Sequence, residues 1–240
     1  MNSRFIHIAL AATLAAPMAH AQPIDYENQE EWKAVHGNSQ SPIDVVTSKA
    51  TTGDAKEPQA IRMGKTRSKL EVEDNGHAVE VEVDGPDAVI RGRHFKMAQF
   101  HFHAASEHTI NGEHAPLEGH FVFKAADGRL AVVGVMYRPG AANALAGRVL
   151  QAISKSKKGE LPSSDISSLL PRNKAYYHYL GSLTTPPLAE NVEWYVLKEP
   201  VSMSEAQLDE FRKHYPHNNR KIQELNNRPL VAYPMGRKGA

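Results

Sequence analysis

The sequence contains no cysteine among its 240 residues. A chain without thiols forms no disulfide, has no thiolate nucleophile and binds no metal through cysteine. Any metal in this protein must therefore be bound by histidine nitrogens and oxygen ligands.

Long hydrophobic runs are also missing. The most apolar stretch runs from Ile8 to about Ala16, and it is too short to span a bilayer as a permanent helix. It follows a weakly positive start and precedes Ala19-His20-Ala21, a small-x-small pattern typical of signal-peptide cleavage. We therefore expect a cleaved signal peptide at residues 1–21, a mature chain of residues 22–240, and a periplasmic or secreted location without a membrane span.

The chain also lacks an excess of charge of either sign. The chain has 28 lysine and arginine residues against 27 aspartate and glutamate residues, and removal of Arg4 with the signal peptide leaves 27 of each sign. A net charge near zero argues against nucleic acid or another polyanion as a partner. The mature length suffices for one domain with a full core, and no repeat or linker divides it.

A strictly alternating stretch begins at Gln99. Gln99, His101 and His103 share one face of an extended strand. Phe100 and Phe102 share the opposite face. This pattern predicts a strand that buries its phenylalanines and presents two histidines together on its other side.

A second alternating run follows a polar turn centred on Asn111-Gly112. There Glu118, His120 and Val122 share a face. Antiparallel pairing of the two runs through this turn would bring His120 near the first two histidines. Three imidazoles from two strands leave the fourth position of a tetrahedral zinc ion open for water, which is the arrangement of a catalytic zinc site.

Two other interpretations fit the same spacing. Histidines on strands are often half-exposed polar residues without a ligand. His101-x-His103, followed by Glu107 and Gly112, also resembles the first metal motif of the cupin jelly rolls. Local spacing does not separate these interpretations, so the rest of the chain must decide.

The remaining sequence predicts a mainly β (α+β) fold. Strands are predicted near residues 70–72, 78–83, 88–91 and 130–137 from alternating or apolar runs. Helices are predicted at 142–155, with a basic end before a glycine, and from Ser204, where Gln207 completes a capping box. Residues 166–172 are predicted to form a loop, and Ser41-Pro42 is a candidate for a cis peptide bond.

A series of segments spread over the mature chain adds a longer pattern. They are QSPID at Gln40, NGHAVEVEV at Asn75, QFHFHAASEHT at Gln99, LEGHFVF at Leu117, RLAVVGVMY at Arg129, GSLTTPP at Gly181, VEWYVLKEP at Val192, and FRKHY with NNRP near the end. In this order they resemble the α-class carbonic anhydrases of the bacterial exported type. Cupins lack the SPI and GSLTTPP segments, and the chain has no second cupin motif, so the cupin interpretation is disfavoured.

The resemblance implies a single catalytic domain with a large twisted, mostly antiparallel central sheet and a few peripheral helices. It implies reversible hydration of carbon dioxide to bicarbonate and a proton, by attack of a zinc-bound hydroxide. The Zn²⁺ cofactor would lie at the base of a conical cleft, bound by His101, His103 and His120.

The same resemblance assigns supporting roles. In chain order, the three ligands would be supported by Gln99, by the backbone near Asn226, and by Glu118. Thr184 would hydrogen-bond the hydroxide and pass its own proton to Glu107. These positions are taken from the family's motifs, since composition and periodicity do not give them.

A proton shuttle and a substrate pocket complete the implied site. His77 would be the shuttle, because an unperturbed imidazole pKa near 6.5 suits proton transfer in both directions at neutral pH. The pocket for carbon dioxide would be lined by Val122, Val132, Leu183, Thr185 and Trp194.

Three positions depart from the family's pattern. The N-terminal aromatic stretch is shortened, which leaves open whether Tyr26 takes the place of the usual cleft tyrosine. Both cysteines that bacterial relatives usually carry are missing, and Leu188 stands at the second of these positions. Ala115 stands where an aromatic residue or histidine is usual.

Two non-enzymatic functions stay open at this stage. One is a catalytically silent relative that serves as a binding module, although such relatives typically lose a zinc histidine. The other is a zinc reservoir. The resemblance also leaves both a monomer and a homodimer open.

Overall fold

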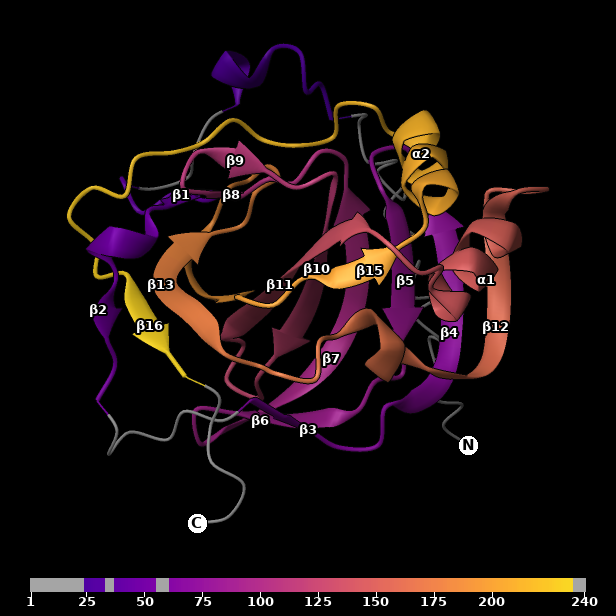
Figure 1. The fold of residues 1–240 in the computed structure, drawn as a ribbon, viewed down its shortest axis with the longest axis horizontal. Coiled ribbons are helices and arrows are strands. Elements are labelled where there is room, and N and C mark those ends of the chain that lie inside the picture. Colours follow the sequence, from indigo (N-terminus) through magenta and orange to yellow (C-terminus); the bar gives the residue numbers. More distant parts are fainter. Residues whose placement is uncertain (1–23, 33–36, 55–60, 235–240) are drawn as a thin grey trace, which may run out of the picture.

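The computed structural model describes residues 24–32, 37–54 and 61–234, so the expected signal peptide lies outside the described residues. Within this part of the chain, most strands form one 13-stranded twisted sheet (Figure 1). Its centre is formed by β7 (Arg93–His103), β10 (Leu117–Lys124) and β11 (Leu130–Pro139). The mainly β fold expected from the sequence is confirmed.

The other strands extend this centre in both directions. Beside β7 follow β5 (Val79–Val83), β4 (Arg67–Asp74) and β12 (Lys158–Asp165). Beside β11 follow β14 (Glu190–Leu197), β13 (Tyr176–Ser182), β16 (Val231–Tyr233) and β2 (Thr51–Thr52). Off this path, β6 (Asp87–Ile90) pairs with β3 (Ile61–Met63) and β7, and β15 (Val201–Met203) pairs with β11. Most pairs are antiparallel, whereas β11 runs parallel to β14.

A second, three-stranded sheet consists of β1 (Asp44–Val45), β8 (Thr109–Ile110) and β9 (Glu113–His114). Asn111 and Gly112 have φ values of 52° and 82°, which is the backbone of a tight hairpin turn. The turn lies at the predicted residues, but it joins β8 to β9, so the expectation that it connects β7 directly to β10 is wrong. The two histidine-bearing strands nevertheless pair as predicted.

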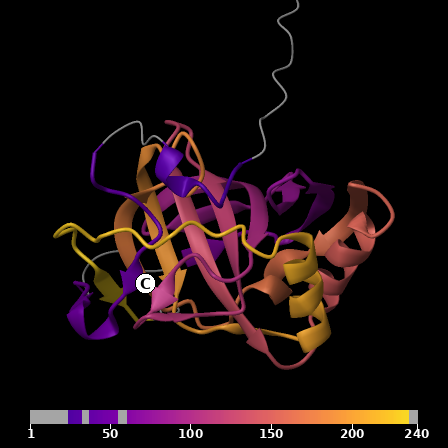
Figure 2. The same ribbon diagram turned by 90° about the horizontal axis from the view of Figure 1, so that it is seen from above.

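The main core lies on the phenylalanine face of the central strands. Phe100 and Phe121 stack at 5.2 Å between ring centroids, and both are fully buried. The helices α1 (Ala144–Ile153) and α2 (Glu205–His214) lie side by side at the β4–β12 end of the sheet and belong to the same apolar cluster (Figures 1 and 2). Full burial of each aromatic side chain contributes roughly 1.5–3 kcal/mol.

Capping side chains define where both helices begin. Asn143 accepts hydrogen bonds from the second and third backbone N–H groups of α1, and Ser204 and Gln207 form the predicted capping box of α2. The structure also contains three short 3₁₀ turns: η1 (Gln29–Glu31), η2 (Thr47–Lys49) and η3 (Ile166–Leu169). The cis peptide bond expected at Ser41-Pro42 is present.

Several strands were not predicted from the sequence, among them β3, β12 and β13. We expected a basic helix end near residues 155–159, but α1 ends at Ile153 and the chain continues as β12. β12 lies at the sheet edge, which tolerates proline and exposed polar residues, so its sequence carries little strand signal. The segment 166–172, predicted as loop, begins with η3.

Candidate metal centre

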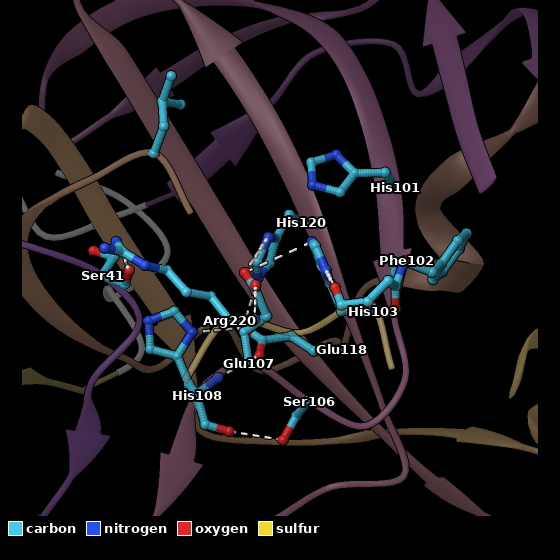
Figure 3. A network of polar contacts seen from close by, with 12 residues as sticks. Ser41, His101, Phe102, His103, Ser106, Glu107, His108, Glu118, His120 and Arg220 are labelled. Atoms are coloured by element: carbon cyan, nitrogen blue, oxygen red, sulfur yellow. Dashed lines mark hydrogen bonds and ion pairs between the residues drawn. The ribbon is translucent and has the colours of Figure 1, made fainter. Parts of the chain in front are cut away.

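Three histidines meet on the face of the sheet opposite the phenylalanines. His101 and His103 lie on β7, and His120 lies on β10 directly across from His101. The ring centroids are 4.9, 5.3 and 4.5 Å apart, and one ligand nitrogen of each ring lies within 4.8 Å of the others. Figure 3 shows these rings beside Glu107 and Glu118. Strand alternation alone thus brings the three predicted ligands together.

The outer nitrogen of each ring lies next to a different acceptor. Nδ1 of His101 lies 2.8 Å from Oε1 of Gln99, and Nε2 of His120 lies 3.0 Å from a carboxylate oxygen of Glu118. Nδ1 of His103 lies 2.5 Å from a backbone carbonyl. These contacts leave Nε2 of the two β7 histidines and Nδ1 of the third to face one another, as metal-binding imidazoles require.

The carbonyl that holds His103 belongs to Asn218 and not to Asn226. The chain contains Asn-Asn-Arg twice, at residues 218–220 and 226–228, and the sequence-based choice fell on the wrong copy. Asn226 donates its side-chain amide to the carbonyl of Asn38 at 2.8 Å. Asn218 follows the end of α2, in the coil that crosses the molecule towards β16 (Figure 1), and its carbonyl is the one that lies next to His103.

Burial keeps the β7 histidines neutral. It lowers the pKa of His101 well below its usual value, and the neighbouring His103 and His120 lower it further. Burial also lowers the pKa of His103. A neutral imidazole offers the lone pair that a metal ion needs. The donor set therefore fits a zinc ion: three histidine nitrogens converge, and Nε2 of His103 is buried without a hydrogen-bond partner.

Glu118 anchors a second network that the sequence did not reveal. It is fully buried, and it accepts from the backbone N–H of His108 and lies 2.8 Å from Nδ1 of the same residue. Nε2 of His108 lies 2.7 Å from the hydroxyl of Tyr179, which donates to Ser41. Burial alone would raise the pKa of the Glu118 carboxyl. The charges of His108 and His120 instead hold this pKa well below its usual value. His108, Glu118 and His120 also satisfy a metal-ligand spacing, but their polar atoms already bond one another.

Glu107 lies completely buried beneath the three rings. Its Oε1 accepts from the backbone N–H of Arg220 at 2.7 Å. Its Oε2 has no hydrogen-bond partner and lies 3.7 Å from Nε2 of His103 and 3.8 Å from Nδ1 of His120. An acceptor oxygen is thus directed at the point where the metal-binding nitrogens converge.

Thr184 is buried in the turn after β13. The hydrogen bond that the resemblance implies from its hydroxyl to Glu107 is not formed in this structure, in which Oε2 of Glu107 has no partner. The role of Thr184 therefore stays a prediction. Thr185 is half-buried in the same turn, where its carbonyl accepts from the N–H of Leu188 at 2.9 Å.

Four of the predicted pocket residues gather in a second apolar cluster. Val132 pairs with Val122 on one side and with Trp194 on the other, and Leu183 packs against the same cluster. The ring of Trp194 lies 4.8 Å from that of His120. Together they provide an apolar wall next to the candidate metal centre.

His77 follows β4 and is half-buried in the loop before β5. Its backbone carbonyl accepts from the side-chain amide of Asn218 at 3.0 Å. Burial lowers the pKa of His77, and this residue in turn contributes to the lowered pKa of His101. His77 is therefore within electrostatic range of the metal-facing rings.

The structure also bears on two departures from the family pattern. Burial raises the pKa of Tyr26, and the charge of Glu107 raises it further, so this tyrosine is within electrostatic range of Glu107. Ala115 is buried in the second apolar cluster, and its backbone N–H donates to Oγ of Ser106 at 2.9 Å.

Comparison with known proteins agrees with this geometry. The family model described as eukaryotic-type carbonic anhydrase matches residues 26–234. The chain belongs to the α-class carbonic anhydrase family. A carbonic anhydrase from Pectobacterium atrosepticum is 37% identical over 201 residues, which cover 81% of this chain and 80% of that protein.

Solved carbonic anhydrases have the same fold. The α-carbonic anhydrase from Thermovibrio ammonificans, solved with the inhibitor sulfanilamide, is 40% identical with a TM-score of 0.74, over 81% of this chain and 87% of that one. A carbonic anhydrase from Chlamydomonas reinhardtii, solved with acetazolamide, is 30% identical with a TM-score of 0.78, over 85% and 95%. α-Carbonic anhydrases are zinc enzymes that hydrate carbon dioxide, and the histidine triad required for that activity is present. Among the described residues, no helix is long and apolar enough to cross a membrane.

Proposed function

We propose that this protein converts carbon dioxide reversibly to bicarbonate and a proton at a zinc ion bound by His101, His103 and His120. The observation that carries the proposal is the anchoring of each ring. The outer nitrogen of every histidine faces a separate acceptor, so the three remaining nitrogens converge with lone pairs free. Three neutral ligands leave the full charge of a metal ion in place.

A zinc ion bound there would lower the pKa of a coordinated water to about 7, a value established for carbonic anhydrases as a class. The remaining roles belong to side chains of this protein. Thr184 would accept a hydrogen bond from the attacking oxygen and donate its own proton to Oε2 of Glu107, the buried acceptor without a partner. This pair would orient the nucleophile towards carbon dioxide held against Val132 and Trp194.

His77 would carry the released proton to solvent. Its half-buried position and its electrostatic coupling to His101 support this role. A shuttle must exchange protons with both the site and bulk buffer, and an imidazole can do so; the lowered pKa of His77 favours release of the proton to solvent.

The test is metal analysis combined with carbon dioxide hydration by stopped-flow on the purified mature protein. We expect one zinc per chain and rapid turnover, both lost in His120→Ala. His94→Ala is the matched control, since His94 lies exposed on the same strand as two of the ligands. Hydration activity retained by a zinc-free His120→Ala protein would overturn the proposal. Zinc binding without turnover in the parent would instead favour a zinc reservoir or a binding module.

We further propose export to the periplasm or the medium after cleavage behind Ala21. The support is the apolar run followed by Ala19-His20-Ala21. Mass spectrometry of the protein recovered from the periplasm of an expressing bacterium should give the mass of residues 22–240. Light scattering on the same sample distinguishes a monomer from a homodimer.

A further inference from the structure

A carboxylate on the neighbouring strand extends the support of one metal ligand. Glu80 lies on β5, paired across from His101, and is half-buried. Its Oε2 accepts from Nε2 of Gln99 at 3.0 Å. Oε1 of the same amide lies 2.8 Å from Nδ1 of His101. Three side chains from two strands thus form a continuous chain of hydrogen bonds that ends at a metal-facing ring.

The three ligand supports differ in chemistry. The carbonyl of Asn218 and the carboxylate of Glu118 can only accept, so each of them requires a proton on the histidine nitrogen that it faces. Gln99 carries an amide, which accepts through Oε1 and donates through Nε2. A reversed amide would donate to Nδ1 of His101, move the ring proton to Nε2 and block the nitrogen that must bind metal.

We infer that Glu80 is a positioning residue that selects the orientation of the Gln99 amide and thereby the tautomer of His101. An ionised carboxylate accepts and cannot donate, so the amide must turn its NH₂ group towards Glu80 and its oxygen towards the ring. The lone pair on Nε2 of His101 then faces His103 and His120. This inference rests on the zinc site proposed above and adds a residue to it.

The same strand supplies a matched control. Glu82 points to the same face two residues further along β5 and is paired with Gln99 in the backbone register, but its side chain is exposed. Among the described residues, the Gln99 amide donates its hydrogen bond to Glu80 and not to Glu82. A substitution at Glu82 therefore removes an equal charge without removing the contact.

Glu80→Gln is the decisive variant. A glutamine at this position can accept from Gln99 or donate to it, so it keeps a hydrogen bond in either orientation and loses only the selection between them. A purely structural role would be preserved in this variant. A role in selecting the orientation of the Gln99 amide would be lost, and the metal-free protein would contain both tautomers of His101.

The first readout is the ¹⁵N spectrum of histidine-labelled, chelator-treated full-length mature protein, with His101 assigned by comparison with His101→Gln. The samples are kept at pH 8, since burial and the neighbouring Glu82 raise the pKa of the Glu80 carboxyl. We expect the parent and Glu82→Gln to show only the Nδ1–H form of His101. Glu80→Gln should show the Nε2–H form as well. A single Nδ1–H form in Glu80→Gln would overturn the inference.

The second readout is the zinc dissociation constant, measured by competition with a chromogenic chelator. If half of the metal-free molecules hold the wrong tautomer, the dissociation constant rises about twofold, because only the competent fraction binds. Glu80→Leu removes the acceptor altogether, and we expect a rise of about 3–10-fold, at or below the range for direct ligand supports. If the parent binds zinc and turns over but Glu80→Leu binds as tightly as Glu82→Leu, the inference fails and the proposed function stands. If the parent binds no zinc, both fail.

Discussion

The carbonyl oxygen of Asn218 lies 2.5 Å from Nδ1 of His103. The side chain of Asn218 also donates to the carbonyls of His77 and Phe102, at 3.0 and 2.9 Å, and accepts from the N–H of Ala104 at 2.9 Å. One buried asparagine thus connects a proposed metal ligand with the segment that carries the proposed proton shuttle.

Asn218→Ala should therefore be strongly destabilising. It leaves the buried carbonyl of Phe102 and the buried N–H of Ala104 without partners, and each such group costs about 1–3 kcal/mol, so we expect the free energy of unfolding to fall by about 2–6 kcal/mol. Asn226→Ala, which removes one contact at an exposed position, should cost less than 2 kcal/mol. Chemical denaturation of both variants measures the difference. Equal losses would contradict this stabilising role of the Asn218 side chain.

Thr184→Ala and Glu107→Ala should both keep zinc and lose turnover. Loss of one positioned polar group typically costs about 10²-fold in rate, near 3 kcal/mol. If the pair acts as one unit, the double variant should be little worse than either single variant. The measurement is a double-mutant cycle on kcat/KM. Fully additive losses would argue against a shared role for the two residues.

His77→Ala should lower kcat and leave kcat/KM nearly unchanged. Proton release limits kcat but takes no part in the attack on carbon dioxide, and a small imidazole buffer should restore part of the loss. The hydroxyl of Tyr215 bonds Asp74 and accepts from the N–H of Gly76, so it clamps the loop before His77. Tyr215→Phe removes both hydrogen bonds and should show the same selective loss more weakly, by about 2–5-fold, which corresponds to about 0.5–1 kcal/mol. A parallel fall of kcat and kcat/KM in His77→Ala would rule out the shuttle.

The environment of Glu193 predicts a loss of stability in acid. The hydrogen bond from His178, aided by Arg93 and only partly offset by burial, lowers the pKa of Glu193 to about 2. A depressed carboxyl pKa stabilises the fold above the unfolded value near 4.5, and this contribution is lost as pH falls from there towards 2. Glu193→Gln should flatten the pH dependence of the melting temperature within that window. Glu199→Gln, an exposed neighbour beyond the end of β14, should leave the dependence as in the parent.

Contacts between residues close together in the sequence could be predicted, whereas contacts between remote residues could not. Alternation from Gln99 to His103 fixes which side chains share a face, and the structure confirms it because strand geometry leaves no alternative. The support of His103 was misassigned because it comes from a backbone carbonyl, which any residue could provide. His108 and Tyr179 were missed for a related reason, since their contacts join strands that are remote in sequence. In the sequence, Glu80 is only one of the polar residues that alternate with valine in a predicted strand.

Because the coil that follows α2 comes late in the chain, the metal site can be completed only after this coil has been synthesised. All three histidines have emerged from the ribosome some hundred residues before Asn218 and Arg220, which orient His103 and Glu107 from that coil. A nascent chain can therefore carry every metal-binding side chain and still lack a formed site. Contacts across such sequence separations form late in folding. We expect tight zinc capture to accompany the last steps of folding and to require a complete C-terminal segment.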